Sequence, residues 1–255
     1  MCPHCRAFIT SKDRVCPYCN ETVGPRAVDR RPDAALLGGL IPAARFNTVL
    51  ILVINFGIYI ATMLNPSITD AGVKLGFHHP YFEWWRLVTA GFFHGGMFHI
   101  LMNSWVLFDL GTQVDMLYGS ARMWVIYFCS SVAGFALSAW WSPNPSLGAS
   151  AALCGLIGAM IALGIKDKTS MGQSIRAVYV RWAIYLLLWS FLPGIDMAAH
   201  IGGGIAGFAI AWVAGLPRIE TNPVERLWRA CSWFCVILTV VSFLKLYLWF
   251  TQVSA

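Results

Sequence analysis

Long apolar runs, separated by short polar segments, dominate the chain from about residue 47 onward. Each run approaches the roughly 20 apolar residues that a helix needs to cross the hydrocarbon core of a bilayer. The runs are continuous rather than alternating, so the pattern favours membrane-spanning helices over the strands of a barrel. We predict seven spans, at residues 47–64, 94–117, 122–141, 148–165, 177–192, 197–215 and 228–250.

The composition places the chain in the same class. Of its 255 residues, 58% are hydrophobic and 12% are charged, and so few charges cannot cover the surface of a soluble domain. Backbone groups within lipid must be satisfied internally, so the predicted fold is an all-α, polytopic membrane helical bundle in the lipid bilayer. A polar, cysteine-containing stretch precedes the first run, so we expect no cleavable signal peptide.

Lys and Arg are distributed unevenly between the two sides of seven alternating spans. One side receives the basic residues before the first span and those that follow the second, fourth and sixth spans. The opposite side receives Lys74 and Arg86, both in one long loop. The positive-inside rule then predicts a cytoplasmic N-terminus and an external C-terminus, and we expect a bacterial inner membrane. The net charge of +6 reflects this topology, and no nucleic-acid partner is expected because the basic residues are scattered.

The N-terminal segment differs in character from the rest. MCPHC and CPYC place Cys2, Cys5, Cys16 and Cys19 as two C-x-x-C pairs with ten residues between them. Two such turns present four thiolates to one metal, and so short a segment needs a metal to fold. We expect Zn, with a rubredoxin-like iron site or two disulfides as alternatives, the disulfides being disfavoured in a reducing cytoplasm. His4 is expected to be a spacer rather than a ligand.

Three parts follow from these patterns. Residues 1–22 are predicted to be a cytoplasmic, zinc-ribbon-like metal-binding segment, and residues 23–46 a linker rich in Pro, Gly and Arg. Residues 47–255 form the predicted transmembrane domain. A sensor in which the metal-binding segment is the working part is one hypothesis that this division leaves open.

Four polar residues interrupt the apolar spans. Ser150, within GASAALCG, is weak evidence alone because a serine hydroxyl can bond back to a helix carbonyl. His99 and Asn103, four residues apart, share one helical face, and His200 lies near the start of the sixth span. The second, fourth and sixth spans run in the same direction, so all four side chains are expected at similar depth. They form either a buried polar network or a catalytic constellation.

Small residues surround two of these four positions. Glycine and alanine line the fourth and sixth spans, which lets the two helices approach closely. The motifs H-x-x-x-N, G-x-S and A-H-x-G-G accompany a Trp-Arg pair and G-x-x-x-D-x-x-x-G, in which Asp115 replaces the usual Glu. With these motifs in order over residues 47–215, the sequence resembles the rhomboid family of intramembrane serine proteases. In the order just given, the five motifs lie at His99–Asn103, Gly148–Ser150, Ala199–Gly203, Trp85-Arg86 and Gly111–Gly119.

The resemblance implies a six-helix rhomboid-like core with a seventh C-terminal span, and a function for each polar residue. Ser150 would be the nucleophile and His200 the general base of a dyad, with no cofactor for catalysis. His99 and Asn103 would stabilise the oxyanion. The family often carries a histidine at His94, which implies a supporting role, although on a continuous helix a residue five positions before His99 points elsewhere. Expected partners are transmembrane protein substrates, cleaved near the external membrane face; the alternative is a non-catalytic rhomboid-like protein that binds transmembrane clients.

Two positions depart from the family pattern. Ala151 stands where glycine usually follows the serine, and Cys154 stands where many members have an aromatic residue that packs on the catalytic imidazole. Asp196, four residues before His200, raises the alternative of a Ser-His-Asp triad. The preceding Leu-Pro-Gly favours instead a helix cap at Asp196.

Overall fold

The computed structural model describes residues 2, 5, 7, 9, 13, 15–21, 23, 46–217 and 222–253. Within these ranges the regular structure is helical, and an isolated β-bridge pairs Lys74 with Ser146. This confirms the predicted all-α bundle. His4 and nearly all of the predicted linker, residues 24–45, lie outside the described residues.

The described helices follow the predicted spans, except that α8 begins at Ser170 and ends at Trp189, whereas the fifth predicted span covers residues 177–192. Among them, four are long and apolar enough to cross a membrane: α1, α6, α9 and α10. Length and composition alone do not mark the other three predicted spans. The second is divided by a π-helical turn, and α7 has fewer residues than a full span needs. Helix α8 carries two charged residues, Arg176 and Arg181. The bounds are α1 (Phe46–Leu64), α4 (Met97–Val106), η4 (Leu107–Gly111), α5 (Thr112–Tyr118), α6 (Ser120–Trp141), α7 (Ser150–Lys166), α8 (Ser170–Trp189), α9 (Met197–Ala214) and α10 (Pro223–Val253).

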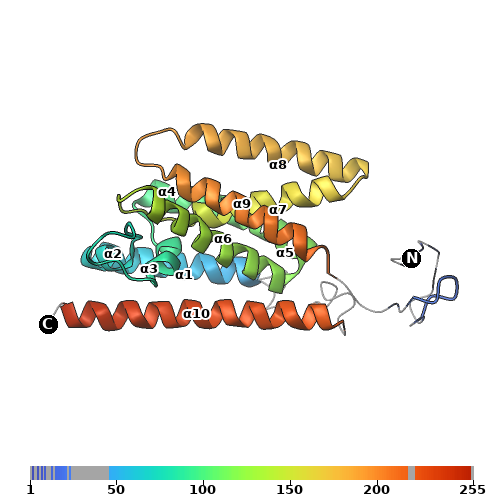
Figure 1. Cartoon of the computed structure of the whole chain (residues 1–255), viewed down its shortest axis with the longest axis horizontal. Coiled ribbons are helices and arrows are strands. Elements are labelled where there is room, and N and C mark those ends of the chain that lie inside the picture. The colour runs from blue at the N-terminus through green and yellow to red at the C-terminus, as the bar shows by residue number, and fades with distance from the viewer. Residues whose placement is uncertain are drawn as a thin grey trace.

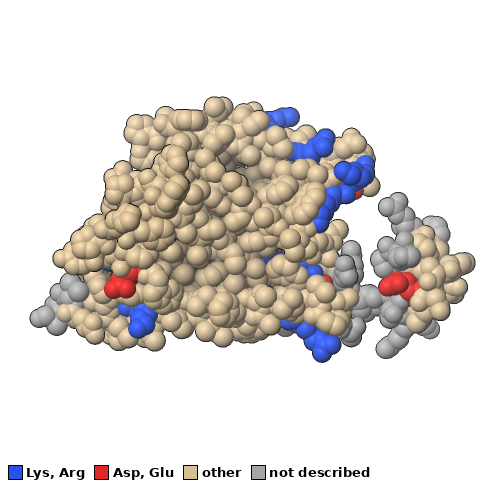
Figure 2. Space-filling view, viewed as in Figure 1, with Lys and Arg blue, Asp and Glu red and all other residues tan. Residues whose placement is uncertain are grey.

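The helices alternate in direction, which brings several of their N-terminal ends together. Helices α4, α7 and α9 begin at one end of the bundle, whereas α1, α8 and α10 begin at the other (Figure 1). On the face in view, Lys and Arg gather mainly at the end where α8 and α10 begin (Figure 2). The polar residues singled out from the sequence belong to the opposite end.

Helix α7 lies at the centre of the bundle and packs on α6, α8 and α9. Glycines make its contact with α9 unusually close. A Cβ atom on Gly203 would collide with the Ala151 backbone, and one on Gly207 would collide with the backbone of Gly155. The small-residue stripes therefore allow the two helix backbones to touch, as the sequence led us to expect.

The loop between α1 and α4 is built from short helices, α2 (Ser67–Gly72), α3 (Arg86–Thr89) and η3 (Ala90–Phe92). Its central side chain is Arg86, which is 1% exposed. The Arg86 guanidinium donates to the carbonyl of Asp70 at 2.7 Å and that of Val73 at 3.2 Å. It also lies 5.0 Å from the ring centroid of Trp249 on α10. Arg86 thus holds the loop to the seventh predicted span.

The G-x-x-x-D-x-x-x-G motif shapes the turn between α5 and α6. The buried Asp115 carboxylate accepts a hydrogen bond from the Ser120 hydroxyl at 2.7 Å. Gly119 adopts φ +80°, a conformation that favours glycine, and its N–H bonds to the Asp115 carbonyl at 2.9 Å.

A second buried polar contact joins α6 to α10, where Arg122 makes a two-pronged ion pair with Glu225 at 2.6 and 2.7 Å.

Candidate functional site

Ser150 is the first residue of α7, and the loop before it requires glycine. Gly148 has φ +129°, which L side chains rarely adopt. A Cβ atom at Gly148 would also lie 2.7 Å from Nε2 of His99. The glycine of the G-x-S motif therefore lets the backbone turn into the helix and lets the His99 ring lie against it.

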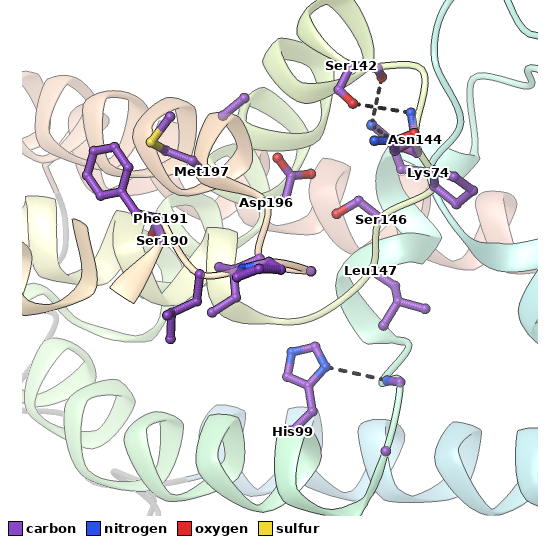
Figure 3. A pocket seen from close by; sticks show the side chains of 18 of the residues that line it. Lys74, His99, Ser142, Asn144, Ser146, Leu147, Ser190, Phe191, Asp196 and Met197 are labelled. Carbon is purple, nitrogen blue, oxygen red and sulfur yellow. Dashed lines mark hydrogen bonds between the residues drawn. The ribbon is translucent and has the colours of Figure 1, made fainter. Parts of the chain in front are cut away.

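Lys74 fixes the same loop from the other side. Its ammonium donates to the carbonyls of Ser142 at 3.2 Å and Asn144 at 2.8 Å (Figure 3), while its backbone pairs with Ser146. The side chain is fully buried, and this burial lowers the pKa of Lys74 from its ordinary value. A buried cation thus holds down the segment that leads to Ser150.

His200 lies in the first turn of α9, whose N-terminus is capped by Asp196. One Asp196 carboxylate oxygen accepts from the Ala199 N–H at 3.0 Å, and the other accepts from the Ser138 hydroxyl. The predicted cap is therefore confirmed. No hydrogen bond joins the Asp196 carboxylate to the His200 ring among the residues that the structure describes, so Asp196 does not take the place of a triad acid.

The close contact between α7 and α9 brings a serine hydroxyl to the imidazole. His200 Nε2 lies 2.8 Å from Oγ of Ser150, within the range that proton transfer requires. The other ring nitrogen, Nδ1, lies 2.6 Å from Oγ of Ser190. Sequence reasoning missed Ser190, because a serine near the end of an apolar helix carries no periodic or motif signal.

His99 and Asn103 face the loop before Ser150 from α4. His99 Nδ1 accepts a hydrogen bond from the Gly95 N–H at 3.4 Å. The other ring nitrogen, Nε2, therefore faces Gly148. Asn103 is buried, and its Nδ2 has no hydrogen-bond partner among the residues that the structure describes. A buried donor without a partner is costly. It is therefore available to an acceptor that arrives during a reaction.

His94 lies closer to this group than helical spacing predicts. Its buried ring packs edge-on against the His99 ring, with the centroids 5.2 Å apart. The expectation that His94 points elsewhere is wrong because α4 begins only at Met97. His94 belongs to the preceding loop, to which helical spacing does not apply.

The two departures from the family pattern are both buried in α7. Ala151 is fully buried, and a Cβ atom on Gly134 of α6 would lie 2.9 Å from the Ala151 methyl. The neighbouring helix therefore has no side chain where this methyl needs room. Cys154 is 8% exposed, so a small thiol fills the place of the usual aromatic ring.

A cavity of about 930 Å³ lies at the same end of the bundle. Its lining includes His99 and Ser190, the polar neighbours of the Ser150–His200 pair, but neither member of that pair. His99 points from α4 towards the loop that carries Ser146 and Leu147 (Figure 3).

The four N-terminal cysteines, Cys2, Cys5, Cys16 and Cys19, lie close together. The Sγ atoms of Cys2 and Cys19, and those of Cys5 and Cys16, are 3.6 Å apart, and all four lie within 4.8 Å of one another. Zn–S bonds of about 2.3 Å give a tetrahedron with edges of roughly 3.8 Å, whereas a disulfide needs about 2.0 Å. The donors and their spacing fit a tetrahedral zinc ion.

Comparison with known proteins gives one family. Residues 81–217 match the Rhomboid domain. The chain is 36% identical over 137 residues to Rhomboid protease GluP of Bacillus subtilis (strain 168), covering 53% of this chain and 27% of that relative. It is 36% identical over 127 residues to Inactive RHOMBOID-like protein 8 of Arabidopsis thaliana, covering 49% of this chain and 36% of the relative. It is 30% identical over 168 residues to Rhomboid-like protease 3 of Toxoplasma gondii, covering 63% of this chain and 64% of the relative.

The matched part therefore spans less than two thirds of each of these three relatives. Two of them are named as proteases and one is named as inactive. The comparison thus bears on the membrane domain, and the chemistry of this chain has to be argued from its own site.

Proposed function

The chain belongs to the rhomboid family, since the Rhomboid domain covers more than half of it, and on this premise we propose that it is an intramembrane serine endopeptidase. It cleaves transmembrane-segment substrates near the external membrane face with Ser150 as nucleophile and His200 as general base. The observation that carries the proposal is the 2.8 Å separation between Ser150 Oγ and His200 Nε2.

In the first step, Nε2 takes the Ser150 proton while Oγ attacks the substrate carbonyl carbon. The carbonyl oxygen becomes an oxyanion near the N-terminus of α7, where the Ser150 N–H and the helix dipole favour negative charge. The spare Asn103 Nδ2 and the His99 ring lie beside the same loop. His94 supports the His99 ring through their edge-on contact. The protonated His200 then gives its proton to the leaving amine, and water releases the acyl group by the reverse sequence.

A non-catalytic protein that binds transmembrane clients is the second candidate function. The likeness to a relative named as inactive and the thiol of Cys154 in place of an aromatic ring favour it. A peptidase is the better proposal because the serine, the imidazole and a buried donor without a partner meet at one place.

We further propose that the basic end of the bundle faces the cytoplasm of a bacterial inner membrane, with the N-terminus inside and the C-terminus outside. The accumulation of Lys and Arg at the end where α8 and α10 begin supports this orientation (Figure 2). The Ser150–His200 pair then lies towards the external face. Proteolytic removal of a C-terminal tag by protease added to intact spheroplasts, without loss of an N-terminal tag, is the expected result.

The N-terminal segment, residues 1–22, would be a closed four-cysteine zinc site that folds when the metal binds and takes no part in catalysis. Residues 23–46 would connect it to the membrane domain, residues 47–255. If removal of residues 1–22 left cleavage intact but abolished its response to added zinc, the segment would be a metal sensor. If nothing changed, it would be a fold element only.

The test of the main proposal is cleavage of a reconstituted single-span substrate by the wild type and by Ser150→Ala. We expect loss of cleavage in Ser150→Ala. Ser174→Ala is the matched control, because the Ser174 hydroxyl is exposed on α8 and bonds only to a helix carbonyl, that of Ser170, at 3.0 Å. Equal cleavage by the wild type and Ser150→Ala would contradict the proposal.

A further inference from the structure

Both ring nitrogens of His200 lie within hydrogen-bond distance of a serine hydroxyl. Nε2 is 2.8 Å from Oγ of Ser150, and Nδ1 is 2.6 Å from Oγ of Ser190. Ser190 directly follows α8 and is 3% exposed. It belongs to none of the motifs that identify the family, yet it contacts the imidazole as closely as the nucleophile does.

A count of hydrogens determines the direction of both contacts. The Ser190 Oγ also lies 2.6 Å from the carbonyl oxygen of Leu186. A carbonyl oxygen can only accept, so the single hydroxyl hydrogen of Ser190 goes to Leu186. Towards His200, Ser190 Oγ can then only accept, and Nδ1 must carry a hydrogen. A neutral imidazole carries one ring hydrogen, which leaves Nε2 bare to accept the Ser150 proton.

We infer that Ser190 is a positioning residue that holds His200 in the tautomer able to act as a base. This inference rests on the proposed peptidase function. When the Ser150 Oγ–H bond breaks and an Nε2–H bond forms, the Nδ1–H···Oγ bond to Ser190 persists and continues to orient the imidazolium ring. Ser190 itself neither gains nor loses a proton in the cycle.

Ser190 occupies the place that a carboxylate takes in a Ser-His-Asp triad. The nearest acid in the sequence, Asp196, caps α9 through the Ala199 N–H, and the partner of Nδ1 is Ser190 instead. A neutral acceptor such as the Ser190 hydroxyl fixes the tautomer through its hydrogen bond alone. Because Ser190 is delivered by α8, the end of this helix must stay against α9 for the tautomer to hold.

The experiment compares Ser190→Ala, Ser190→Thr and Ser242→Ala in the full-length protein. Ser242 is the matched control, because its buried hydroxyl makes the same helix bond, to the Leu238 carbonyl at 2.7 Å, on α10. Two readouts are taken: kcat and KM on a reconstituted substrate, and the ¹⁵N shifts of the His200 ring above pH ~6.5, where the free imidazole is neutral. A His200→Gln variant assigns the signals among the six histidines.

The wild type is expected to carry hydrogen on Nδ1 alone. Ser190→Ala should show a mixture of tautomers and a kcat lower on the order of tenfold, with KM unchanged. Ser190→Thr, which keeps the hydroxyl, should restore both, and Ser242→Ala should match the wild type. A wild-type spectrum with hydrogen on Nε2, or equal losses in Ser190→Ala and Ser242→Ala, would overturn the inference.

The spectrum requires no turnover, so the two proposals can fail separately. A wild type that does not cleave but carries hydrogen on Nδ1 refutes the peptidase and leaves the positioning role of Ser190 standing. A wild type that cleaves with hydrogen on Nε2 refutes the role of Ser190 alone. The wild-type spectrum decides this even if Ser190→Ala does not fold.

Discussion

Helices α7 and α8 follow one another in the chain but have opposite surroundings. Thirteen of the 17 residues of α7 are buried, whereas only Gly172 and Tyr179 are buried among the 20 residues of α8. Helix α7 is rich in small residues and packs mainly on α6, α8 and α9, while α8 directs large apolar side chains outwards, where lipid solvates them. Ser150 therefore begins the tightly packed helix, and Ser190, the second partner of the His200 ring, follows the loosely packed one.

The contrast in packing predicts a large difference between two leucines. Leu156 of α7 is fully buried, and Leu188 of α8 is 62% exposed. Leu156→Ala should lower the free energy of unfolding by about 2–5 kcal/mol, because it removes buried methyl groups and leaves a cavity. Leu188→Ala should change it by less than about 0.5 kcal/mol. Unfolding in mixed micelles measures both, and equal losses would contradict the contrast.

Asn103 tests whether the polar groups opposite the start of α7 serve chemistry rather than packing. Asn103→Ala should lower kcat by about 10²–10³-fold, the usual cost of one oxyanion donor. Its stability should change little, because Nδ2 has no hydrogen-bond partner to lose among the described residues. Asn55→Ala removes a buried asparagine of α1 and should leave kcat unchanged. A fall in stability with unchanged kcat for Asn103→Ala would mean a packing role.

Two adjacent glycines measure how close α7 and α9 must be. A Cβ atom on Gly203 would collide with the Ala151 backbone, whereas one on Gly204 would meet its nearest neighbour, the Cys154 carbonyl, at an ordinary 3.7 Å. Gly203→Ala should destabilise the protein by about 1–3 kcal/mol and reduce cleavage. Gly204→Ala gains the same helix propensity and should be neutral or stabilising. If both variants behave alike in thermal unfolding, the close contact does not limit the fold.

The smallest expected effect concerns the attachment of α8. The Tyr179 hydroxyl donates to the Gln113 side-chain oxygen at 2.8 Å and joins α8 to α5. Tyr179→Phe should cost about 0.5–1.5 kcal/mol and increase hydrogen exchange in α8 more than in α7. Tyr185→Phe is the control, because Tyr185 is 55% exposed on the same helix. Equal exchange in the two variants would show that this bond does not hold α8.

The sequence predicts the helices and the four polar positions for the same reason. Run length and a repeat of 3.6 residues are local properties, so α1 and α6 could be located without a structure, as could the shared face of His99 and Asn103. Ser190 and His94 could not be interpreted in this way. Their neighbours depend on where α8 ends, where α4 begins, and how the loops fold back, which no periodicity encodes.

The central claim is that His200 activates Ser150. The most direct measurement is the intact mass and peptide map of the purified protein after reaction with a fluorophosphonate, for the wild type, Ser150→Ala and His200→Ala. We predict one adduct, on Ser150, in the wild type and none in either variant. An unmodified wild type, or an adduct that persists in Ser150→Ala, would contradict the account.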